Sequence, residues 1–372
     1  MRNFTLKGLF LAVVFMVLGS LSIQAADGDL ITKQITIKLE EAGTLPSKIG
    51  DTKKYKITNL KIMGEINGTD LCFIREMAGS DREGWRTEGK LATLDLSGAK
   101  IVRGGGIYYN SVNCYTSDDV IGNYAFSDCS GLTSLILPSN VTSIGYSAFY
   151  GCIRLTSLTL PSSVTSIGSS AFEGCRSLTS LILPSSVTSI GSSAFYGCSG
   201  LTSLTLPSSV TEIGESAFRG CRSLASLTLP SSVTEIGESA FEGCIRLASL
   251  TLPSSVTSIG KSAFEGCSGL TSIYVSWESP LSIDASTFKD ANTGKCILYV
   301  PKGTYDDYWL SNWGIFENIV EYDATGIDHI TTSGEAKEIS RYAADGQRLE
   351  VPAKGLNIVK YSDGCVKKVV VQ

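Results

Sequence analysis

The sequence predicts a solenoid in which parallel β rungs are connected by short helical or 3₁₀ turns. Three observations lead to this fold: a repeat of 23 residues, leucines at positions 1, 4 and 6 of most repeats, and columns of phenylalanine and cysteine that keep the same step. A helix-bearing cap is expected before the array, and a small antiparallel β module after it. The two columns are Phe126, Phe149, Phe172, Phe195, Phe218, Phe241 and Phe264, and Cys129, Cys152, Cys175, Cys198, Cys221, Cys244 and Cys267.

The unit that begins at Leu178 illustrates how one repeat is expected to fold. Leu178, Leu181 and Leu183 have the spacing of a leucine-rich repeat strand, in which positions 4 and 6 point to the same side of an extended chain. Pro184 ends the strand because it has no backbone N–H to donate. The apolar residues of 194–198 have the spacing of one helical or 3₁₀ turn, which returns them to the interior.

A single repeat is too small to fold alone. Burying about eight apolar side chains contributes on the order of 15 to 20 kcal/mol. Fixing the backbone of the unit costs more, at about 1 to 2 kcal/mol for each residue. Stacking against both neighbours supplies the difference, so the repeats are expected to form one continuous array.

Irregular rungs extend the array at both ends. The pattern of positions 1, 4 and 6 begins again at Ile57 and at Leu91, and residues 298–300 match positions 4 and 6, which gives about ten rungs in total. Between the first two rungs, Thr69 and Asp70 precede an apolar pattern that predicts an N-capped amphipathic helix. The region before the regular repeats is therefore expected to be a thicker cap that contains a helix.

These patterns divide the chain into five segments. They are a signal peptide (1–25), an N-terminal cap with irregular rungs (26–120), the regular repeats (121–282), a degenerate repeat with a C-terminal cap (283–322), and a linker with a β-rich module (323–372). Aromatic residues at helix-like intervals in 304–320 predict the lid that closes the last rung. In the last segment, apolar residues alternate around Asp345-Gly346 and Asp363-Gly364, which predicts antiparallel hairpins.

The first residues have the order of a secretory signal peptide. Arg2 and Lys7 supply positive charge, residues 9–18 are apolar, and small residues follow, with cleavage expected near Ala25. The apolar run is too short to cross a bilayer, which takes about 20 residues, and no later segment is long and apolar enough. The mature chain is therefore expected to be exported into an oxidising space.

Composition excludes several classes of function. The net charge of −5 argues against a nucleic-acid groove, which needs a concentrated basic face. The chain has one histidine, His329, which excludes the commoner zinc sites and leaves general-base chemistry to carboxylates. We therefore expect no metal or cofactor site, no nucleic-acid partner and no enzymatic activity.

The cysteine column has two interpretations. It could be a redox or metal ladder, or a row of buried free thiols that act as small apolar side chains. The second is preferred, because in-register side chains on parallel rungs point the same way and neither histidine nor a C-x-x-C motif accompanies them. Pairing among the other cysteines stays open; these are Cys72, Cys114, Cys296 and Cys365.

Two further patterns are expected to carry no chemistry. The glutamates Glu212, Glu215, Glu235 and Glu238 would stack into a stripe, which favours solubility over a paired-carboxylate hydrolase. Residues 104–106 and 260–262 resemble fragments of phosphate-binding loops, but the rest of that motif is missing. Both segments are expected to be turns.

The outward side of the strands is the candidate ligand-binding surface. Position 3 is serine throughout the regular repeats, and position 5 is uncharged. Short side chains lose little rotamer entropy on docking, and aromatic residues supply interface anchors. The candidate residues are Ile182, Thr205, Thr228, Thr251, Tyr274, Trp277 and Tyr299.

Other interpretations of this surface stay open. Serine and threonine are also simply tolerated in strands, in which case the array is a passive surface spacer or coat protein. A regular lattice of hydroxyl groups that orders ice is a third possibility. In the preferred interpretation the partner is an extracellular protein or another cell surface.

The motif I-G-x-x-A-F-x-x-C-x-x-L-x-S-L-x-L-P-x-x-V, read from Ile121 to Val256, resembles the BspA-like leucine-rich repeat family. Residues 64–70 and 94–102 are also similar to the N-terminal region of such proteins. The resemblance implies an extracellular, non-enzymatic solenoid on a bacterial surface that attaches to host proteins or to other cells.

The C-terminal segment carries a second, shorter resemblance. D-G-Q-R-L from Asp345, K-G-L-N-I-V-K-Y-S-D-G from Lys354 and K-K-V-V-V at 367–371 are similar to C-terminal sorting modules of the type IX secretion route. This similarity implies export to the outer surface of a Gram-negative bacterium. An ordinary terminal β hairpin is the alternative, since alternating apolar residues around Asp-Gly are common.

Overall fold

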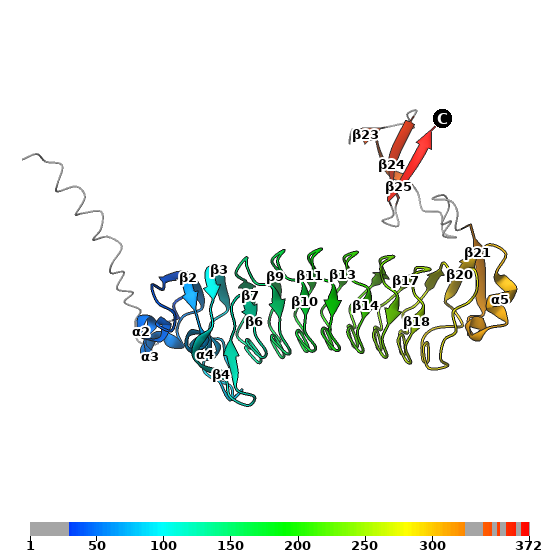
Figure 1. Ribbon diagram of the computed structural model, residues 1–372. Coiled ribbons are helices and arrows are strands. Elements are labelled where there is room, and N and C mark those ends of the chain that lie inside the picture. The colour runs from blue at the N-terminus through cyan, green and yellow to red at the C-terminus, as the bar shows by residue number, and fades with distance from the viewer. Residues whose placement is uncertain (1–29, 324–337, 344–347, 350–354, 362–365, 372) are drawn as a thin grey trace, which may run out of the picture. The chain divides into compact units, whose positions relative to one another are not determined.

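The computed structural model describes residues 30–323, 338–343, 348–349, 355–361 and 366–371. The expected signal peptide lies outside these residues. The chain forms two compact units, one that ends at Glu321 and one that begins at Tyr322. In the first unit the coils stack one on the next from the cap to the lid, so the predicted parallel solenoid is confirmed (Figure 1).

Two rows of parallel strands form the sides of the regular repeats. The strands of one row begin at position 3 of each unit: β7 (Ser134–Ile136), β9 (Ser157–Thr159), β11 (Ser180–Ile182), β13 (Ser203–Thr205), β15 (Ser226–Thr228), β17 (Ser249–Leu252) and β19 (Ser272–Val275). The other row is a continuous sheet of β6 (Val120–Ile121), β8 (Ser143–Ile144), β10 (Ser166–Ile167), β12 (Ser189–Ile190), β14 (Glu212–Ile213), β16 (Glu235–Ile236) and β18 (Ser258–Ile259). Pairing is in register, so equivalent residues of neighbouring units lie side by side.

The first row is longer than the sequence predicted. It continues toward the N-terminus through β3 (Thr93–Ile101), β2 (Asn59–Ile66) and β1 (Ile35–Lys38), and toward the C-terminus through β20 (Ile297–Pro301). The row therefore has eleven parallel strands instead of about ten rungs. The additional strand is β1, which pairs Ile35 with Leu60 and Ile37 with Ile62. A further strand, β21 (Asn318–Tyr322), lies next to β20.

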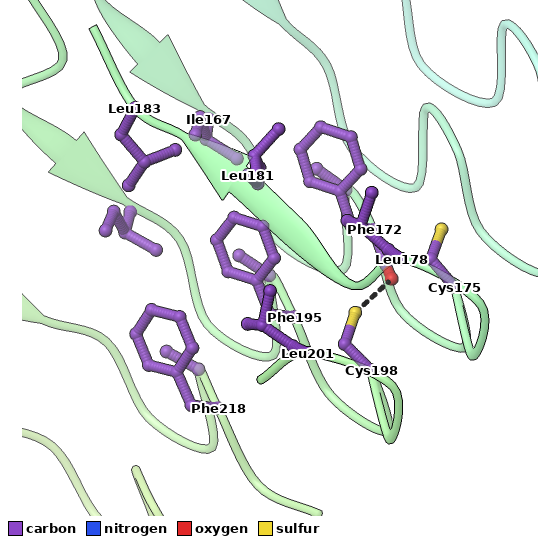
Figure 2. Close-up of a cluster of buried hydrophobic side chains, with 14 of the residues drawn as sticks. Ile167, Phe172, Cys175, Leu178, Leu181, Leu183, Phe195, Cys198, Leu201 and Phe218 are labelled. Carbon is purple, nitrogen blue, oxygen red and sulfur yellow. Dashed lines mark hydrogen bonds between the residues drawn. The ribbon is translucent and has the colours of Figure 1, made fainter. Parts of the chain in front are cut away.

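The phenylalanine and cysteine columns fill the core. Neighbouring phenylalanine rings from Phe126 to Phe288 are stacked with centroids 5.1 to 5.5 Å apart. Each turn that carries these residues is closed by bonds from residue i to residue i−3, as from the Cys198 N–H to the Phe195 carbonyl oxygen at 3.1 Å. This is the hydrogen-bond pattern of a 3₁₀ turn. Figure 2 shows Phe172, Phe195 and Phe218 in this stack, beside Cys175 and Cys198.

The N-terminal cap contains the helices α2 (Leu45–Ile49), α3 (Asp51–Lys54) and α4 (Gly68–Met77). The predicted helix is α4, but its N-cap is Asn67 and not Thr69 or Asp70. The Asn67 side chain accepts from the Thr69 N–H at 3.0 Å, and the Asp70 carboxylate accepts from the Asn67 N–H at 3.0 Å. The hairpin of β4 (Gly104–Tyr109) and β5 (Cys114–Thr116) was not predicted, because residues 104–106 were expected to form a turn.

The aromatic lid lies on the last rungs. Helix α5 (Tyr305–Trp309) and the 3₁₀ helix η1 (Asn312–Ile315) place Tyr308, Trp313 and Phe316 in the core. The Tyr308 hydroxyl donates to the Trp277 carbonyl oxygen at 2.9 Å, which fixes the lid to the array.

The second unit is a small antiparallel sheet, as the sequence predicted. Its strands β22 (Glu338–Ala343), β23 (Arg348–Leu349), β24 (Gly355–Tyr361) and β25 (Val366–Val371) are arranged in the order β23-β22-β24-β25. The two Asp-Gly pairs lie outside the described residues. Each falls between two strands that pair antiparallel, β22 with β23 and β24 with β25.

Candidate binding surface

The outward side of the first row, called the strand face below, consists of positions 3 and 5 of strands β7 to β19 together with Tyr299. Along β9, β11, β13 and β15 the residue at position 4 is buried, while those at positions 3 and 5 are exposed. This alternation is expected of a strand with one side in the core. The predicted outward direction of the serines and threonines is therefore confirmed.

Six of the seven candidate residues occupy position 5 of their rungs. In the strand pairing, Ile182 lies opposite Thr205 and Thr228 lies opposite Thr251. Thr251 lies opposite Tyr274 on its other side, and Tyr274 lies opposite Tyr299. Ile182 is 81% exposed, Thr205 and Thr228 are exposed, and Thr251 is half-buried.

The two tyrosines form one aromatic surface at the C-terminal end of the strand face. Their rings are stacked with centroids 4.4 Å apart and planes inclined by 4°. Both side chains are half-buried, because each ring covers one side of the other. A partner would therefore meet the edges and the uncovered sides of a rigid pair.

Trp277 does not belong to this surface. Its place in the sequence predicted a position beside the exposed anchors, but its side chain is only 8% exposed. Its indole N–H donates to the Val256 carbonyl oxygen at 2.8 Å, and its ring lies 5.9 Å from that of Trp313. Trp277 therefore packs under the lid, and its polar group already has a partner within the chain.

The strand face contains a groove that sequence analysis missed. Among the described residues, the hydrogen-bonded ladder of the first row is interrupted between β9 and β11 and between β13 and β15. At the first interruption a groove of about 370 Å³ opens, with Leu158, Leu160, Ile182 and Pro184 among its lining residues. The exposed Ile182 thus stands at the edge of a partly apolar groove.

The cysteine column consists of buried, unpaired thiols. All ten cysteines in the described part of the chain are free, including Cys72, Cys114 and Cys296. Burial raises the pKa of the Cys198 thiol and of the Cys267 thiol to about 12, so both are protonated at neutral pH. These thiols are donors to backbone carbonyl groups, as Cys152 is to Phe126 at 3.0 Å. Cys365 lies outside the described residues.

The glutamate stripe lies on the second row of strands. Glu212 and Glu235 are neighbours in register on β14 and β16, as predicted, and both are exposed. Within the described ranges, no group of three or more histidine, cysteine, aspartate or glutamate side chains could hold a metal ion. His329 lies outside the described residues. No helix among those described is both long and apolar enough to cross a membrane.

Comparison with known proteins identifies the repeats. Residues 119–224 and 188–300 match the model of the BspA type leucine rich repeat region, with six copies. The repeat array belongs to the BspA-type leucine-rich repeat family. No curated protein matches the chain.

Three solved structures similar to this chain are described as leucine-rich proteins. One from T. pallidum is 41% identical over 41% of this chain and 71% of its own, with a TM-score of 0.40. One from Bacteroides ovatus is 24% identical over 64% of this chain and 65% of its own, with a TM-score of 0.42. A leucine rich cell surface protein from Faecalibacterium prausnitzii is 22% identical over 78% and 88%, with a TM-score of 0.35. The fold described above rests on the chain's own strand pairing.

Proposed function

We propose that this chain is exported, is displayed on the outer surface of a Gram-negative bacterium, and binds an extracellular protein or another cell surface through its strand face without performing chemistry. The observation that carries the proposal is the arrangement of position 5. Six uncharged residues, from Ile182 to Tyr299, occupy position 5 of successive rungs, and they are paired in register on either side of the interruption between β13 and β15.

The physical character of the strand face suits a broad contact. Serine and threonine side chains are short, so docking orders few rotatable bonds. Two separate points of the strand face carry apolar or aromatic groups. One is Ile182 at the edge of its groove, and the other is the stacked pair of Tyr274 and Tyr299. Protein interfaces are commonly anchored by a few such residues. Thr205 and Thr228 occupy the exposed stretch between these points.

Charge placed at the centre of the strand face tests this function. The double variant Thr205→Glu with Thr228→Glu should reduce retention of the mature chain on whole bacterial cells or immobilised matrix proteins by more than about tenfold, because buried unpaired carboxylates are costly. The matched control is Ser208→Glu with Ser231→Glu, which adds the same charge to the same two repeats at exposed residues outside the strand face. Equal retention of both double variants would favour a passive spacer.

Export and surface attachment are proposed from the two ends of the chain. The pattern of residues 1–25 supports a signal peptide, and the antiparallel sheet of β22 to β25 supports a folded module of the kind that a sorting signal needs. Deleting residues 331–372 should leave the chain in the periplasm, as measured by cell fractionation and by surface proteolysis of intact cells. A truncated chain that still reaches the cell exterior would contradict the sorting role.

A further inference from the structure

A second column of side chains lies along the turns that carry the phenylalanine stack. We call it the turn column, and it consists of the residue that follows each stacked phenylalanine from Phe149 to Phe288: Tyr150, Glu173, Tyr196, Arg219, Glu242, Glu265 and Lys289. Backbone bonds hold its members on adjacent turns, as from the Gly174 N–H to the Tyr196 carbonyl oxygen at 2.8 Å. Neighbouring members are therefore about 4.8 Å apart along the array.

In the C-terminal half of the turn column every cation has a partner. The Arg219 guanidinium lies 5.9 Å from the centre of the Tyr196 ring, and its Nη2 is 2.7 Å from Glu242 Oε1. The Lys289 Nζ is 2.9 Å from Glu265 Oε1. Arg219 is thus held between an aromatic ring on one side and a carboxylate on the other.

The N-terminal half has two tyrosines and a carboxylate on successive turns, but no cation among them. Glu173 lies between Tyr150 and Tyr196, and Asp128 lies one turn before Tyr150. Burial, and then the negative charges of Glu173 and Asp128, raise the pKa of the Tyr150 hydroxyl. Among the described residues, neither carboxylate has a cationic nitrogen within 4.0 Å.

These side chains line a groove of about 560 Å³. Tyr150 and Tyr196 are 40% and 38% exposed, so a ligand can reach their rings. The groove is also lined by the glycines Gly151, Gly174 and Gly197, each with φ between 66° and 73°. Because glycine has no side chain, the space above the backbone stays open.

We infer that this groove binds an arginine or lysine side chain of the protein partner, placed between Tyr150 and Tyr196 and paired with Glu173. The position of Arg219 between Tyr196 and Glu242 is the internal example of this arrangement. Cations are attracted to the faces of aromatic rings, and a carboxylate adds a charge-assisted hydrogen bond. The inference rests on the proposed function in one respect, that the partner is a protein.

Two arginines that line the groove restrict which partner segments can bind there. These are Arg86 and Arg176, and neither forms an ion pair with Asp128 or Glu173 within the described residues. These two exposed cations repel a uniformly basic chain. The groove therefore favours one cationic side chain that is flanked by neutral or acidic residues.

A peptide titration tests the inference directly. The probe is the blocked pentapeptide acetyl-Gly-Ser-Arg-Ser-Gly-amide, and its control is the same peptide with citrulline, which has nearly the same shape and no charge. Binding to the mature chain is measured by NMR chemical shifts of the peptide. The arginine peptide should bind at least about fivefold more tightly than the citrulline peptide. The variants Glu173→Gln and Tyr150→Leu should each remove most of this difference, with folding checked by circular dichroism.

The matched control is Glu235→Gln, which removes one exposed negative charge outside the groove and should leave peptide binding unchanged. Equal binding of the two peptides, or an equal effect of Glu173→Gln and Glu235→Gln, would overturn the inference. The strand-face variant Thr205→Glu with Thr228→Glu should bind the arginine peptide normally. Loss of peptide binding to the groove can therefore be distinguished from loss of partner binding to the strand face.

Discussion

The Cys198 thiol donates a hydrogen bond to the carbonyl oxygen of Phe172, 3.1 Å away (Figure 2). The same carbonyl oxygen accepts the Cys175 N–H at 3.1 Å, so it has two donors from two successive turns. Equivalent thiol bonds recur from Cys152 to Cys267. Each of these six cysteines thus adds to the core both apolar volume and a bond between neighbouring turns.

The first prediction concerns thiol reactivity. At pH 8 a disulfide reagent such as DTNB should modify the column cysteines of the folded chain slowly, because burial excludes the reagent and holds the pKa of Cys198 at about 12. Absorbance at 412 nm measures the reaction, and the chain in 6 M guanidinium chloride is the control. Immediate modification of the seven column thiols in the folded chain would show that they are accessible.

The second prediction is loss of stability at high pH. Burial raises the pKa of Cys198 from 9.0 to about 12 in the folded chain. The unfolded chain therefore loses this proton first, and stability falls as the pH rises above about 9, by at most about 1.4 kcal/mol per pH unit for each thiol. Urea unfolding from pH 7 to pH 11 measures the slope. Cys198→Ala should be about 1 to 2 kcal/mol less stable at pH 7, with a smaller slope above pH 9; an unchanged slope would contradict the assignment.

The third prediction concerns a left-handed serine in each turn. Ser193 has φ of 56°, and Ser147, Ser170, Ser216, Ser239 and Ser262 have similar values. Ser193→Gly should leave the unfolding free energy within about 0.5 kcal/mol, whereas Ser193→Val should lower it by about 1 to 2 kcal/mol, because a β-branched residue resists this conformation. The control is Ser192→Val, since Ser192 has no positive φ. Equal destabilisation by both valine variants would contradict the argument.

The fourth prediction concerns Arg75, which is fully buried at the junction of cap and array. Its guanidinium donates to the carbonyl oxygens of Tyr124 and Asp81 at 2.6 and 3.0 Å and to the Ser80 hydroxyl at 3.1 Å. Arg75→Met should lower the unfolding free energy by about 2 to 4 kcal/mol, because these acceptors lose their charged donor.

Amide hydrogen exchange shows where Arg75→Met acts. The increase in exchange rate should be largest in residues 68–86. Arg75→Lys should not restore protection, because one ammonium group cannot span acceptors that a planar guanidinium reaches. The exposed Arg82→Met is the control. Uniform exchange along the whole chain would show that Arg75 does not hold the cap in place.

The regular array could be predicted because each of its features is repeated. The direction of a single leucine is ambiguous, but the same apolar positions recur in register in unit after unit, and the alternation at Leu181 and Ile182 follows from strand geometry. Strand β1 was missed because Ile35 and Ile37 lack the leucine pattern and are recognisable only through their pairing with β2. The sequence around these two residues did not by itself indicate a strand of the array.

The error at Trp277 has a different cause. It lies two residues after Val275, and Val275 lies two after Ile273, so the alternation itself places Trp277 on the inner side. The groove beside Tyr150 and Glu173 was missed because the turn column varies in sequence. The charge of the groove depends on which residues follow one another from turn to turn, and on Arg86, a lining residue from the cap.

Successive turns share the same core residues, and this affects how the gene can change. Each coil touches only the coils before and after it, and residues 178–200 could be removed to join Ser177 to Leu201 without altering the packing at the junction. An in-frame loss or gain of one such unit would move the lid by a single step and leave both ends intact. The reach of the molecule can therefore evolve in whole increments, independently of the cap that starts it and the lid that closes it.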